Sequence, residues 1–236
     1  MTLVLLAPIS FGASCWDGVD LPDVATAKHE LPGFGSRARA ARQPTMASLA
    51  AEVAETHDGP LDLVGVSMGG MVAQHVAIDY PERVRSLLVA CTGAAVNPAA
   101  MLARADAAES GGMEAVVPVT LERWFTQRAL AASPPHPGVE YARRTLLALD
   151  PSVFADGWRA MSGHDVNDRL SSITATTTCV AGTSDPVGTP ERVRELTDGI
   201  AGAKMVTIEG PHMIHLESPA EFGAVVRDHL ERAGGA

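Results

Sequence analysis

The sequence predicts an α/β fold, in which a mostly parallel sheet is flanked by helices and carries one helical insertion. Short, continuously apolar runs alternate with longer segments of helical spacing, a pattern typical of a parallel sheet covered on both faces. With 236 residues, 46% of them apolar and 19% charged, the chain can bury one sizeable core. No internal repeat or low-complexity tract interrupts the pattern.

Six apolar runs predict strands, and four segments with apolar residues at helical spacing predict the helices between them. The predicted strands are Leu3–Leu6, Thr26–Leu31, Leu61–Val66, Ser86–Cys91, Thr177–Ala181 and Lys204–Ile208. The predicted helices are Met46–His57, Gly70–Asp79, Pro190–Thr197 and Pro219–Arg232. The first run lacks the basic segment of a signal peptide, so we expect a buried first strand there and neither a leader nor a membrane span.

One stretch, from about residue 94 to residue 170, breaks this alternation. Met113–Leu130 and Gly138–Leu149 have helical spacing, and the breaker Ser-Pro-Pro-His-Pro-Gly separates them at 133–138. Because open α/β sheets bind ligands at their carboxyl edge, this insertion is predicted to be a lid over that edge. We therefore divide the chain into a core of residues 1–93 and 171–236 and a helical lid of residues 94–170.

The composition argues against nucleic acids, disulfides and structural metals. The formal net charge is −10, and Lys and Arg do not cluster along the chain, so binding to a polyanion is not expected. Cys15, Cys91 and Cys179 are odd in number and far apart in the sequence. They are predicted to be reduced, buried thiols of a cytoplasmic protein.

Residues 65–69, Gly-Val-Ser-Met-Gly, match the pattern G-x-S-x-G and predict a nucleophile at Ser67. The pattern alone is weak, but a predicted strand precedes it and a predicted helix follows it, which is the context of a nucleophile elbow. Side chains at Gly65 or Gly69 are expected to collide with neighbouring backbone at such a strained turn. The alternative is a tight turn with an idle serine.

A serine hydroxyl needs a base, and His212 is the best placed of the eight histidines. It follows the predicted strand Lys204–Ile208 at the same edge of the sheet as Ser67, and His215 is its rival. Asp185 follows the preceding strand and is predicted to orient the imidazole, with a turn or helix-cap aspartate as the alternative. The two histidines lack the carboxylate of a zinc-binding helix, so no metal is expected.

Two backbone N–H groups are predicted to stabilise an oxyanion beside the serine. One belongs to Met68, directly after the nucleophile, and the other to the loop Ala7–Gly12 after the first strand. Phe11 is the predicted donor in that loop. Backbone donors leave little trace in side-chain identity, so no further residue marks this pair.

With these residues in view, the chain resembles α/β hydrolases of the 3-oxoadipate enol-lactonase group nearly from end to end. The residues that carry the resemblance are Ser10–Gly12 with Trp16, Leu31–Gly35, Gly65–Gly70, Tyr80–Val84, Gly111–Met113, Glu122–Thr126 and His212–Pro219. The lid stretches are the most particular to this group. The segment His212–Pro219 favours His212 over His215 as the base, and the order serine, aspartate, histidine along the chain is the one this fold has.

Two departures from the group stand out in the N-terminal part. Members usually begin with a hairpin ahead of the strand placed here at Leu3–Leu6, and we expect none in this chain. The His-Gly pair that often precedes the oxyanion donor is replaced by Ile9-Ser10, a feature that enol-lactonases tend to share.

The resemblance implies a lactone substrate with a free carboxylate, opened through an acyl-enzyme on Ser67 without a metal or organic cofactor. Arg123 and Arg128 flank Trp124 and are the nearest cations for that carboxylate, although arginines on an amphipathic helix are usually solvated. Trp124 either lines the pocket or pins the lid to the core. The implied partner is therefore a small-molecule ester or lactone, and whether the chain is a monomer or a homo-oligomer is left open.

Two other functions stay open at this point. A carboxylesterase or carbon–carbon bond hydrolase of small metabolites would use the same three residues and would prefer apolar esters or diketones. A ligand-binding or scaffold protein would keep the fold without the chemistry, and its serine would not react with a fluorophosphonate probe.

Overall fold

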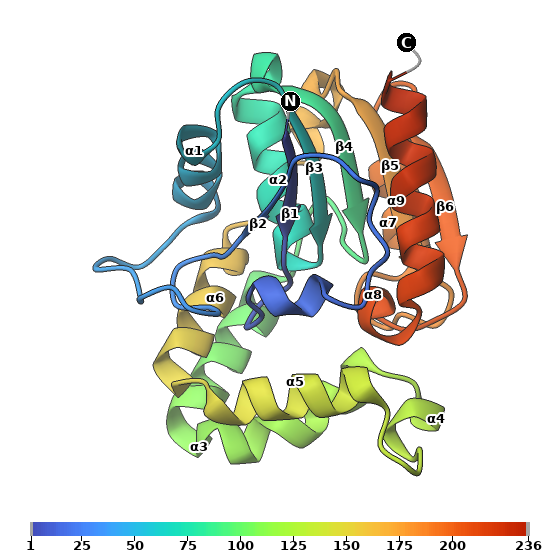
Figure 1. Cartoon of the computed structure of the whole chain (residues 1–236). Coiled ribbons are helices and arrows are strands. Elements are labelled where there is room, and N and C mark those ends of the chain that lie inside the picture. Colours follow the sequence, from blue (N-terminus) through green and yellow to red (C-terminus); the bar gives the residue numbers. More distant parts are fainter. Residues whose placement is uncertain (1, 235–236) are drawn as a thin grey trace.

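Six parallel strands form one sheet at the centre of the protein (Figure 1). The computed structural model describes residues 2–234. The strands are β1 (Thr2–Leu6), β2 (Thr26–His29), β3 (Leu61–Val66), β4 (Val84–Ala90), β5 (Thr176–Gly182) and β6 (Lys204–Ile208). They lie in the order β2-β1-β3-β4-β5-β6, and every pair of neighbours is parallel. The six predicted strands are confirmed, with ends that differ by at most two residues.

Helices cover both faces of this sheet. They are α1 (Met46–Thr56), α2 (Met68–Asp79), α7 (Pro190–Asp198) and α9 (Pro219–Gly234). In Figure 1, α9 lies in front of the sheet against β4, β5 and β6, and α2 lies behind it against β1, β3 and β4. Every residue of α2 from Met68 to Ile78 is buried, because α1 covers the side of α2 that faces away from the sheet. The mainly apolar character of this helix therefore follows from its central position.

The N-terminus of α1 shows how local sequence fixes where a helix begins. The Thr45 hydroxyl accepts the backbone N–H of Ser48 at 3.1 Å, and the Ser48 hydroxyl accepts the backbone N–H of Thr45 at 2.9 Å. This reciprocal cap satisfies two N–H groups that have no partner inside the helix. Shorter elements complete the core: α8 (Ile214–Glu217) and the 3₁₀ turns Ala13–Trp16, Pro81–Arg83 and Asn167–Ser172.

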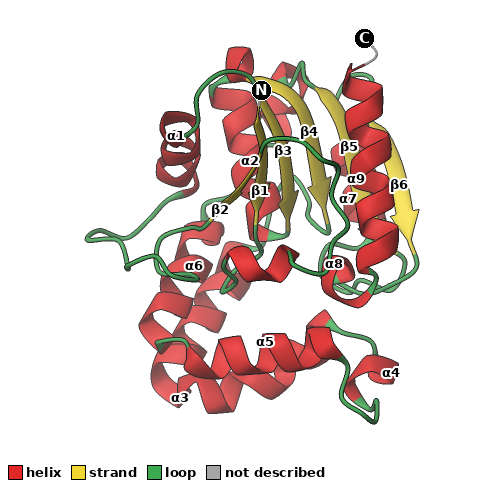
Figure 2. Ribbon diagram, viewed as in Figure 1, coloured by secondary structure: helices red, strands yellow, loops and turns green. Residues whose placement is uncertain are grey.

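Four helices lie between β4 and β5, at the carboxyl ends of the strands (Figure 2). They are α3 (Pro98–Trp124), α4 (Gln127–Leu130), α5 (Pro137–Ala148) and α6 (Pro151–Ser162). The helix α3 is kinked at Gly112, whose backbone has φ 75° and ψ 174°. Only a glycine takes this conformation easily, so the kink divides α3 into two arms.

The prediction of one helix over Met113–Leu130 is wrong at its C-terminal end. Phe125 and Thr126 are extended, because the Thr126 backbone N–H donates to Glu217 Oε2 at 3.0 Å and its hydroxyl donates to the same carboxylate. The Thr126 hydroxyl also accepts the Ala129 N–H at 3.2 Å and so starts α4 as a separate turn. The helix α6 was not predicted.

The two ends of the insertion leave the core side by side. Ala95 and Asp165 form an antiparallel bridge, in which Val166 N–H donates to Ala94 at 2.8 Å and Val96 N–H donates to His164 at 3.1 Å. The division into a core of 1–93 and 171–236 and a lid of 94–170 stays a prediction.

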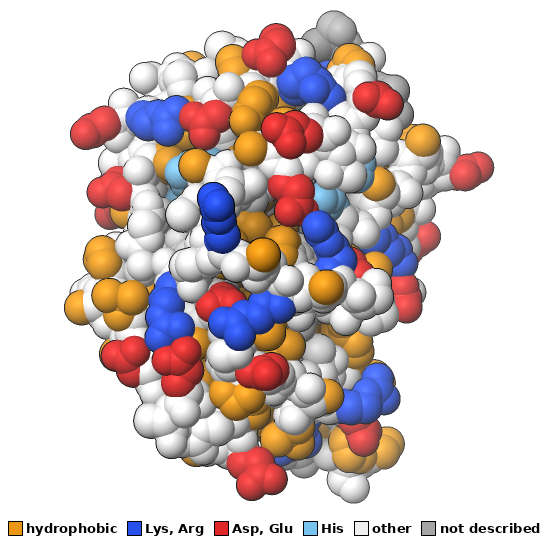
Figure 3. Space-filling model, turned by 90° about the vertical axis from the view of Figure 1, so that its left-hand side faces the viewer, with side chains coloured by type: hydrophobic (Ala, Val, Ile, Leu, Met, Phe, Trp, Pro, Cys, Tyr) orange, Lys and Arg blue, Asp and Glu red, His pale blue; other side chains and the backbone are white. Residues whose placement is uncertain are grey.

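Charged side chains of both signs are interspersed on the face of the protein shown in Figure 3. Ion pairs join several of them, such as Arg159 with Glu109 at 2.6 Å and Arg39 with Asp156 at 2.6 Å. Within residues 2–234, no helix is both long enough and apolar enough to cross a membrane.

Candidate active site

Ser67 lies at a sharp turn between β3 and α2. Its backbone has φ 52° and ψ −116°, a strained conformation for a residue with a side chain. A Cβ at Gly65 would lie 2.4 Å from the carbonyl oxygen of Gly69, and one at Gly69 would lie 2.0 Å from the carbonyl oxygen of Leu6. The expected collision is thus present at both glycines, and together they allow the turn to pack against β1.

Ser67, His212 and Asp185 form one hydrogen-bonded chain, although they are far apart in the sequence. Ser67 Oγ lies 2.9 Å from His212 Nε2, and His212 Nδ1 lies 2.9 Å from Asp185 Oδ2. The three side chains are buried, with at most 6% of each residue exposed. They follow β3, β5 and β6, so the carboxyl ends of three strands bring them together.

The Asp185 carboxylate is held in place by its own loop. Its Oδ1 accepts the backbone N–H groups of Val187 at 2.7 Å and Gly188 at 3.1 Å. These bonds leave Oδ2 to accept a hydrogen bond from the Nδ1–H of His212, which fixes the tautomer in which Nε2 has a free lone pair toward Ser67. In this tautomer the imidazole is ready to take a proton from the serine hydroxyl.

His215, the rival base, has a different environment. Its ring packs against Trp16, with 5.2 Å between ring centroids, and against Phe222 at 6.2 Å. Neither ring nitrogen has a hydrogen-bond partner among the described residues. Complete burial lowers the pKa of His215 to about 3. It is therefore a neutral ring inside the core, and the structure brings His212 to the serine instead.

The two predicted oxyanion donors lie at the N-terminus of α2 and in the loop after β1. Met68 is the first residue of α2, where backbone N–H groups have no partner within the helix. The Phe11 N–H makes only a long 3.3 Å bond, to Pro8. The ring of Phe11 packs against Trp124 with 5.5 Å between centroids. Ser10, which replaces the usual glycine, has φ 78° and so keeps the left-handed turn of this loop.

Glu30, which the sequence reasoning missed, anchors this loop. Its carboxylate accepts the Ala13 N–H at 2.8 Å, the Ser36 N–H at 2.9 Å and the Ser36 hydroxyl at 2.6 Å. A Cβ at Gly12 would lie 2.4 Å from Glu30 Oε1, and one at Gly35 only 1.9 Å from it. The glycines thus make room for a carboxylate that ties the loop after β1 to the loop after β2.

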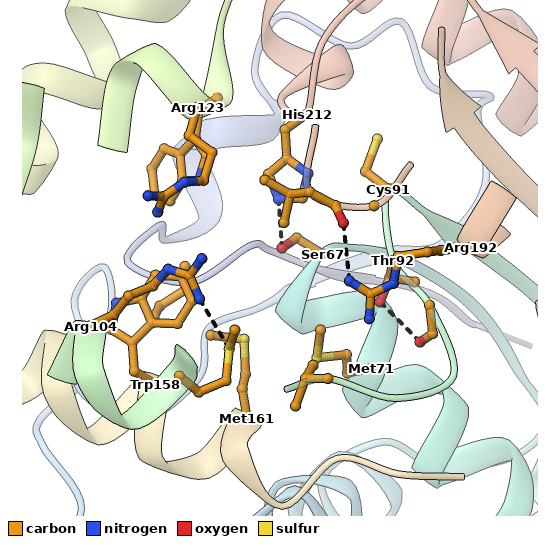
Figure 4. Close-up of a pocket in the computed structure, with 17 residues that line it drawn as sticks. Ser67, Met71, Cys91, Thr92, Arg104, Arg123, Trp158, Met161, Arg192 and His212 are labelled. Atoms are coloured by element: carbon orange, nitrogen blue, oxygen red, sulfur yellow. Dashed lines mark hydrogen bonds between the residues drawn. The ribbon is translucent and has the colours of Figure 1, made fainter. Parts of the chain in front are cut away.

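A cavity of about 40 Å³ lies beside Ser67 and His212 (Figure 4). Its wall is mainly apolar and includes Trp124. This placement agrees with the first of the two alternatives for Trp124, in which it lines the pocket. Trp124 is also buried against the core and is 2% exposed. The other alternative, that it pins the lid to the core, stays a prediction.

Among residues 2–234, three arginines and no carboxylate line this wall: Arg104, Arg123 and Arg192. The first two lie on the two arms of α3, which the kink at Gly112 turns toward the same pocket. Neither forms an ion pair with a carboxylate of residues 2–234. In a protein of net charge −10, this is a local concentration of positive charge.

Arg104 and Trp158 were not predicted, and they form one side of the pocket. The Arg104 guanidinium carbon lies 5.1 Å from the centroid of the Trp158 ring, within the range of a cation–π contact. Burial, and then the nearby charge of Arg123, lower the pKa of Arg104 from its usual value. A lone cation in the alanine-rich stretch 98–108 was the one sequence signal that pointed to it.

Arg192, also missed, holds two other segments together. Its guanidinium donates to the carbonyl of Val187, in the Asp185 loop, at 3.2 Å, and to the carbonyl of Ala95, in the joint of the lid. Two of its N–H groups are therefore used within the protein. Its charge still faces the pocket, as Figure 4 shows.

Arg128 does not reach this pocket, and the expectation that it binds substrate there is wrong. The structure places it in a separate hollow with Glu209, Glu217 and Glu221. The break at Phe125 separates α4 from α3, so Arg128 no longer shares a helix with Arg123. Its neighbours are carboxylates, which would repel an anionic substrate.

Cys91 is a third potential ligand beside the acid and the base. One donor atom each of Cys91, Asp185 and His212 lies within 4.8 Å of the others. Burial, and then the Asp185 charge, raise the pKa of the Cys91 thiol well above its usual value. It is therefore a protonated thiol, not a nucleophile.

Comparisons with known proteins agree with this architecture. Residues 3–225 match the alpha/beta hydrolase family. The curated 3-oxoadipate enol-lactonase 2 of Acinetobacter baylyi is 30% identical over 169 residues, which are 71% of this chain but only 62% of that enzyme. A pimeloyl-[acyl-carrier protein] methyl ester esterase of Neisseria meningitidis is 28% identical over 214 residues, 86% of this chain and 81% of that protein.

Among solved structures, the enol-lactonase from Burkholderia xenovorans LB400 has the same fold. It superposes with a TM-score of 0.92 over 98% of this chain and 91% of that one, at 24% identity. The names of these relatives describe hydrolases of ester or lactone bonds. Since the family match spans most of its length, the chain belongs to the alpha/beta hydrolase family.

Proposed function

We propose that the protein is a serine hydrolase that opens a small enol-lactone with a free carboxylate, of the 3-oxoadipate enol-lactone type, through an acyl-enzyme. The observation that carries the proposal is the pocket wall, where Arg104 and Arg123 lie beside the Ser67–His212 pair and form no ion pair with a carboxylate in the described part of the chain. A cation held in an apolar wall attracts an anion strongly, because water screens it less there. A neutral ester would gain nothing from these two charges.

In the proposed first step, Ser67 Oγ attacks the lactone carbonyl while His212 Nε2 takes the hydroxyl proton across 2.9 Å. Asp185, bonded to Nδ1 at 2.9 Å, stabilises the imidazolium that forms. The Phe11 and Met68 N–H groups hold the oxyanion. The ring C–O bond then breaks, and the enolate oxygen that leaves takes the proton from His212.

In the second step, water attacks the acyl-enzyme. His212 removes a proton from the water and returns it to Ser67 Oγ as the ester bond breaks. The released enol converts to a ketone, which makes ring opening favourable. The cycle consumes one water and regenerates the starting proton positions, so it requires neither a metal nor an organic cofactor.

The substrate carboxylate is placed between Arg104 and Arg123. A guanidinium offers several N–H donors in a planar fork that matches a carboxylate. The stacking of Arg104 on Trp158 restricts its side chain in advance, so less conformational entropy is lost on binding. Thus the lid supplies charge recognition while the core supplies the reaction.

The resemblance to enol-lactonases in sequence supports the lactone, and the esterase relative supports the alternative of a carboxylesterase for small acidic esters. That alternative keeps the same three reacting residues and the same two arginines. A carbon–carbon bond hydrolase is a further alternative on this site. The cytoplasmic location remains a prediction of the same proposal.

Hydrolysis of 3-oxoadipate enol-lactone by the purified protein tests the proposal. We expect turnover on the order of 10⁴ M⁻¹s⁻¹ or more, and a loss on the order of 10⁶-fold in kcat in Ser67→Ala. Ser184→Ala, at an exposed serine, is the matched control. If Ser67 reacts with a fluorophosphonate but the lactone is not hydrolysed, the lactone assignment is wrong and esters and diketones become the substrates to test.

A further inference from the structure

Cys91 lies on the pocket wall and has no part in the proposed hydrolysis. It directly follows β4, has φ 54°, and is 1% exposed. Figure 4 shows it beside His212, and both residues line the same cavity. Its sulfur and the donor atoms of Asp185 and His212 all lie within 4.8 Å of one another.

A thiol, an imidazole and a carboxylate are a ligand set that zinc and softer divalent cations prefer. In a tetrahedral zinc site with bond lengths of about 2.0–2.3 Å, donor atoms are about 3.3–3.7 Å apart. The Cys91 sulfur would have to approach the other two donors by roughly 1 Å, whereas His212 Nδ1 and Asp185 Oδ2, now 2.9 Å apart, would have to separate by roughly 0.4 Å.

We propose that Cys91, Asp185 and His212 bind a thiophilic divalent cation such as Zn²⁺ or Cd²⁺, and that its binding stops hydrolysis. The inhibition rests on the proposed function, whereas the binding itself does not. The charges balance: a thiolate and a carboxylate carry two negative charges, the imidazole is neutral, and the ion carries two positive charges. A neutral complex avoids the high cost of burying net charge.

The binding step releases one proton. The Cys91 S–H bond breaks, its proton goes to solvent, and a sulfur–metal bond forms. The metal takes the lone pair of His212 Nδ1, the ring nitrogen that faces Asp185, and the ring proton moves to Nε2. Nε2 then donates to Ser67 Oγ and cannot accept the serine proton. The ion therefore removes the base without touching the nucleophile.

Titration of the whole protein with Cd²⁺ tests the proposal with two separate measurements. The ultraviolet thiolate-to-cadmium charge-transfer band reports a sulfur ligand, and the rate of 4-nitrophenyl acetate hydrolysis reports the base. Cys91→Ala and Cys91→Ser are the test variants. Cys15→Ala and Cys179→Ala, at the other two buried thiols, are the matched controls. Each protein is compared with its own rate in the absence of metal.

We expect the wild type and both controls to bind one Cd²⁺ with the charge-transfer band and to lose activity in proportion. Cys91→Ala and Cys91→Ser should lose the band and bind Cd²⁺ more than about tenfold more weakly. Equal inhibition in the Cys91 variants, or loss of the band in a control instead, would overturn the proposal.

A ¹¹³Cd NMR spectrum of the wild type decides the matter even if the Cys91 variants do not fold. A shift typical of one sulfur with nitrogen and oxygen ligands supports the site, and a shift typical of oxygen ligands alone excludes it. Should the protein hydrolyse no ester at all, the proposed function fails while the charge-transfer band still reports binding.

Discussion

Replacing Asp185 by Asn tests how the acid controls the proton on His212. Asp185 Oδ1 accepts the N–H groups of Val187 and Gly188, and Oδ2 lies 2.9 Å from His212 Nδ1. An Asn side chain would place one oxygen and one NH₂ group at these two points. With its oxygen toward the two backbone donors, the NH₂ group must face the imidazole.

The opposite orientation would leave the buried Gly188 N–H and the part-buried Val187 N–H without an acceptor, at a cost of about 1–3 kcal/mol for the buried one. The first orientation therefore dominates, and His212 Nδ1 must accept a hydrogen bond. Its proton then lies on Nε2, which donates to Ser67 instead of accepting. The wrong tautomer should lower kcat on the order of 10⁴-fold, or about 5 kcal/mol in the barrier, with KM nearly unchanged because the pocket arginines are untouched.

The assay is steady-state hydrolysis of the enol-lactone and of 4-nitrophenyl acetate by Asp185→Asn. Asp168→Asn, at an exposed aspartate, is the matched control and should keep its activity. Circular dichroism checks that both variants fold. A folded Asp185→Asn protein that retains more than about a tenth of kcat would refute the role of Asp185 as the orienting acid.

Three further perturbations test other parts of the site. Arg104→Met and Arg123→Met should each raise KM for carboxylated substrates about 10- to 100-fold, because each removes a charge-assisted hydrogen bond. The KM for neutral esters should not change, and equal effects on both kinds of substrate would contradict the carboxylate role. Glu30→Gln has one acceptor oxygen in place of two, so either the Ala13 N–H or the Ser36 N–H loses its acceptor. Its kcat should fall about tenfold while KM is kept, and an unchanged kcat would show that the loop does not need this carboxylate. The folded pKa of His215 is about 3 against 6.5 when unfolded, so the unfolded state binds the proton first as the pH falls. Below pH 6.5 this group should therefore lower the free energy of unfolding by up to about 1.4 kcal/mol per pH unit. In urea unfolding, the stability of His215→Phe should depend less on pH than that of the wild type. An equal pH dependence would show that the ring is protonated in the folded state.

The strands could be predicted because each is encoded by a short continuous segment. Ser67, Asp185 and His212 could be predicted because each directly follows such a segment. A short, mainly apolar run such as Leu61–Val66 is typical of a buried strand in a parallel sheet. Once the strands are known, the loops after them lie at one edge of the sheet. Ser67, Asp185 and His212 could therefore be selected from their position directly after strands, and the structure brings them within hydrogen-bonding distance.

The lid was less predictable because contacts distant in sequence shape it. The break after α3 depends on Glu217, which is 91 residues from Thr126. Arg123 and Arg128 are five residues apart, which on a continuous helix already turns them about 140° from each other. Arg104 reaches the pocket only because α3 bends at Gly112, and no spacing rule connects it with Arg123.

Arg192 has a mechanical consequence for catalysis. One guanidinium holds the carbonyl of Val187, two residues from the acid, and the carbonyl of Ala95, where the insertion leaves the sheet. Any movement of the insertion that carries Ala95 away must either break the hydrogen bond to Arg192 or displace the loop that holds the Asp185 carboxylate. We therefore expect that any opening of the insertion would also disturb the alignment of His212 by Asp185, so that the reactive arrangement is kept only while the insertion stays in place.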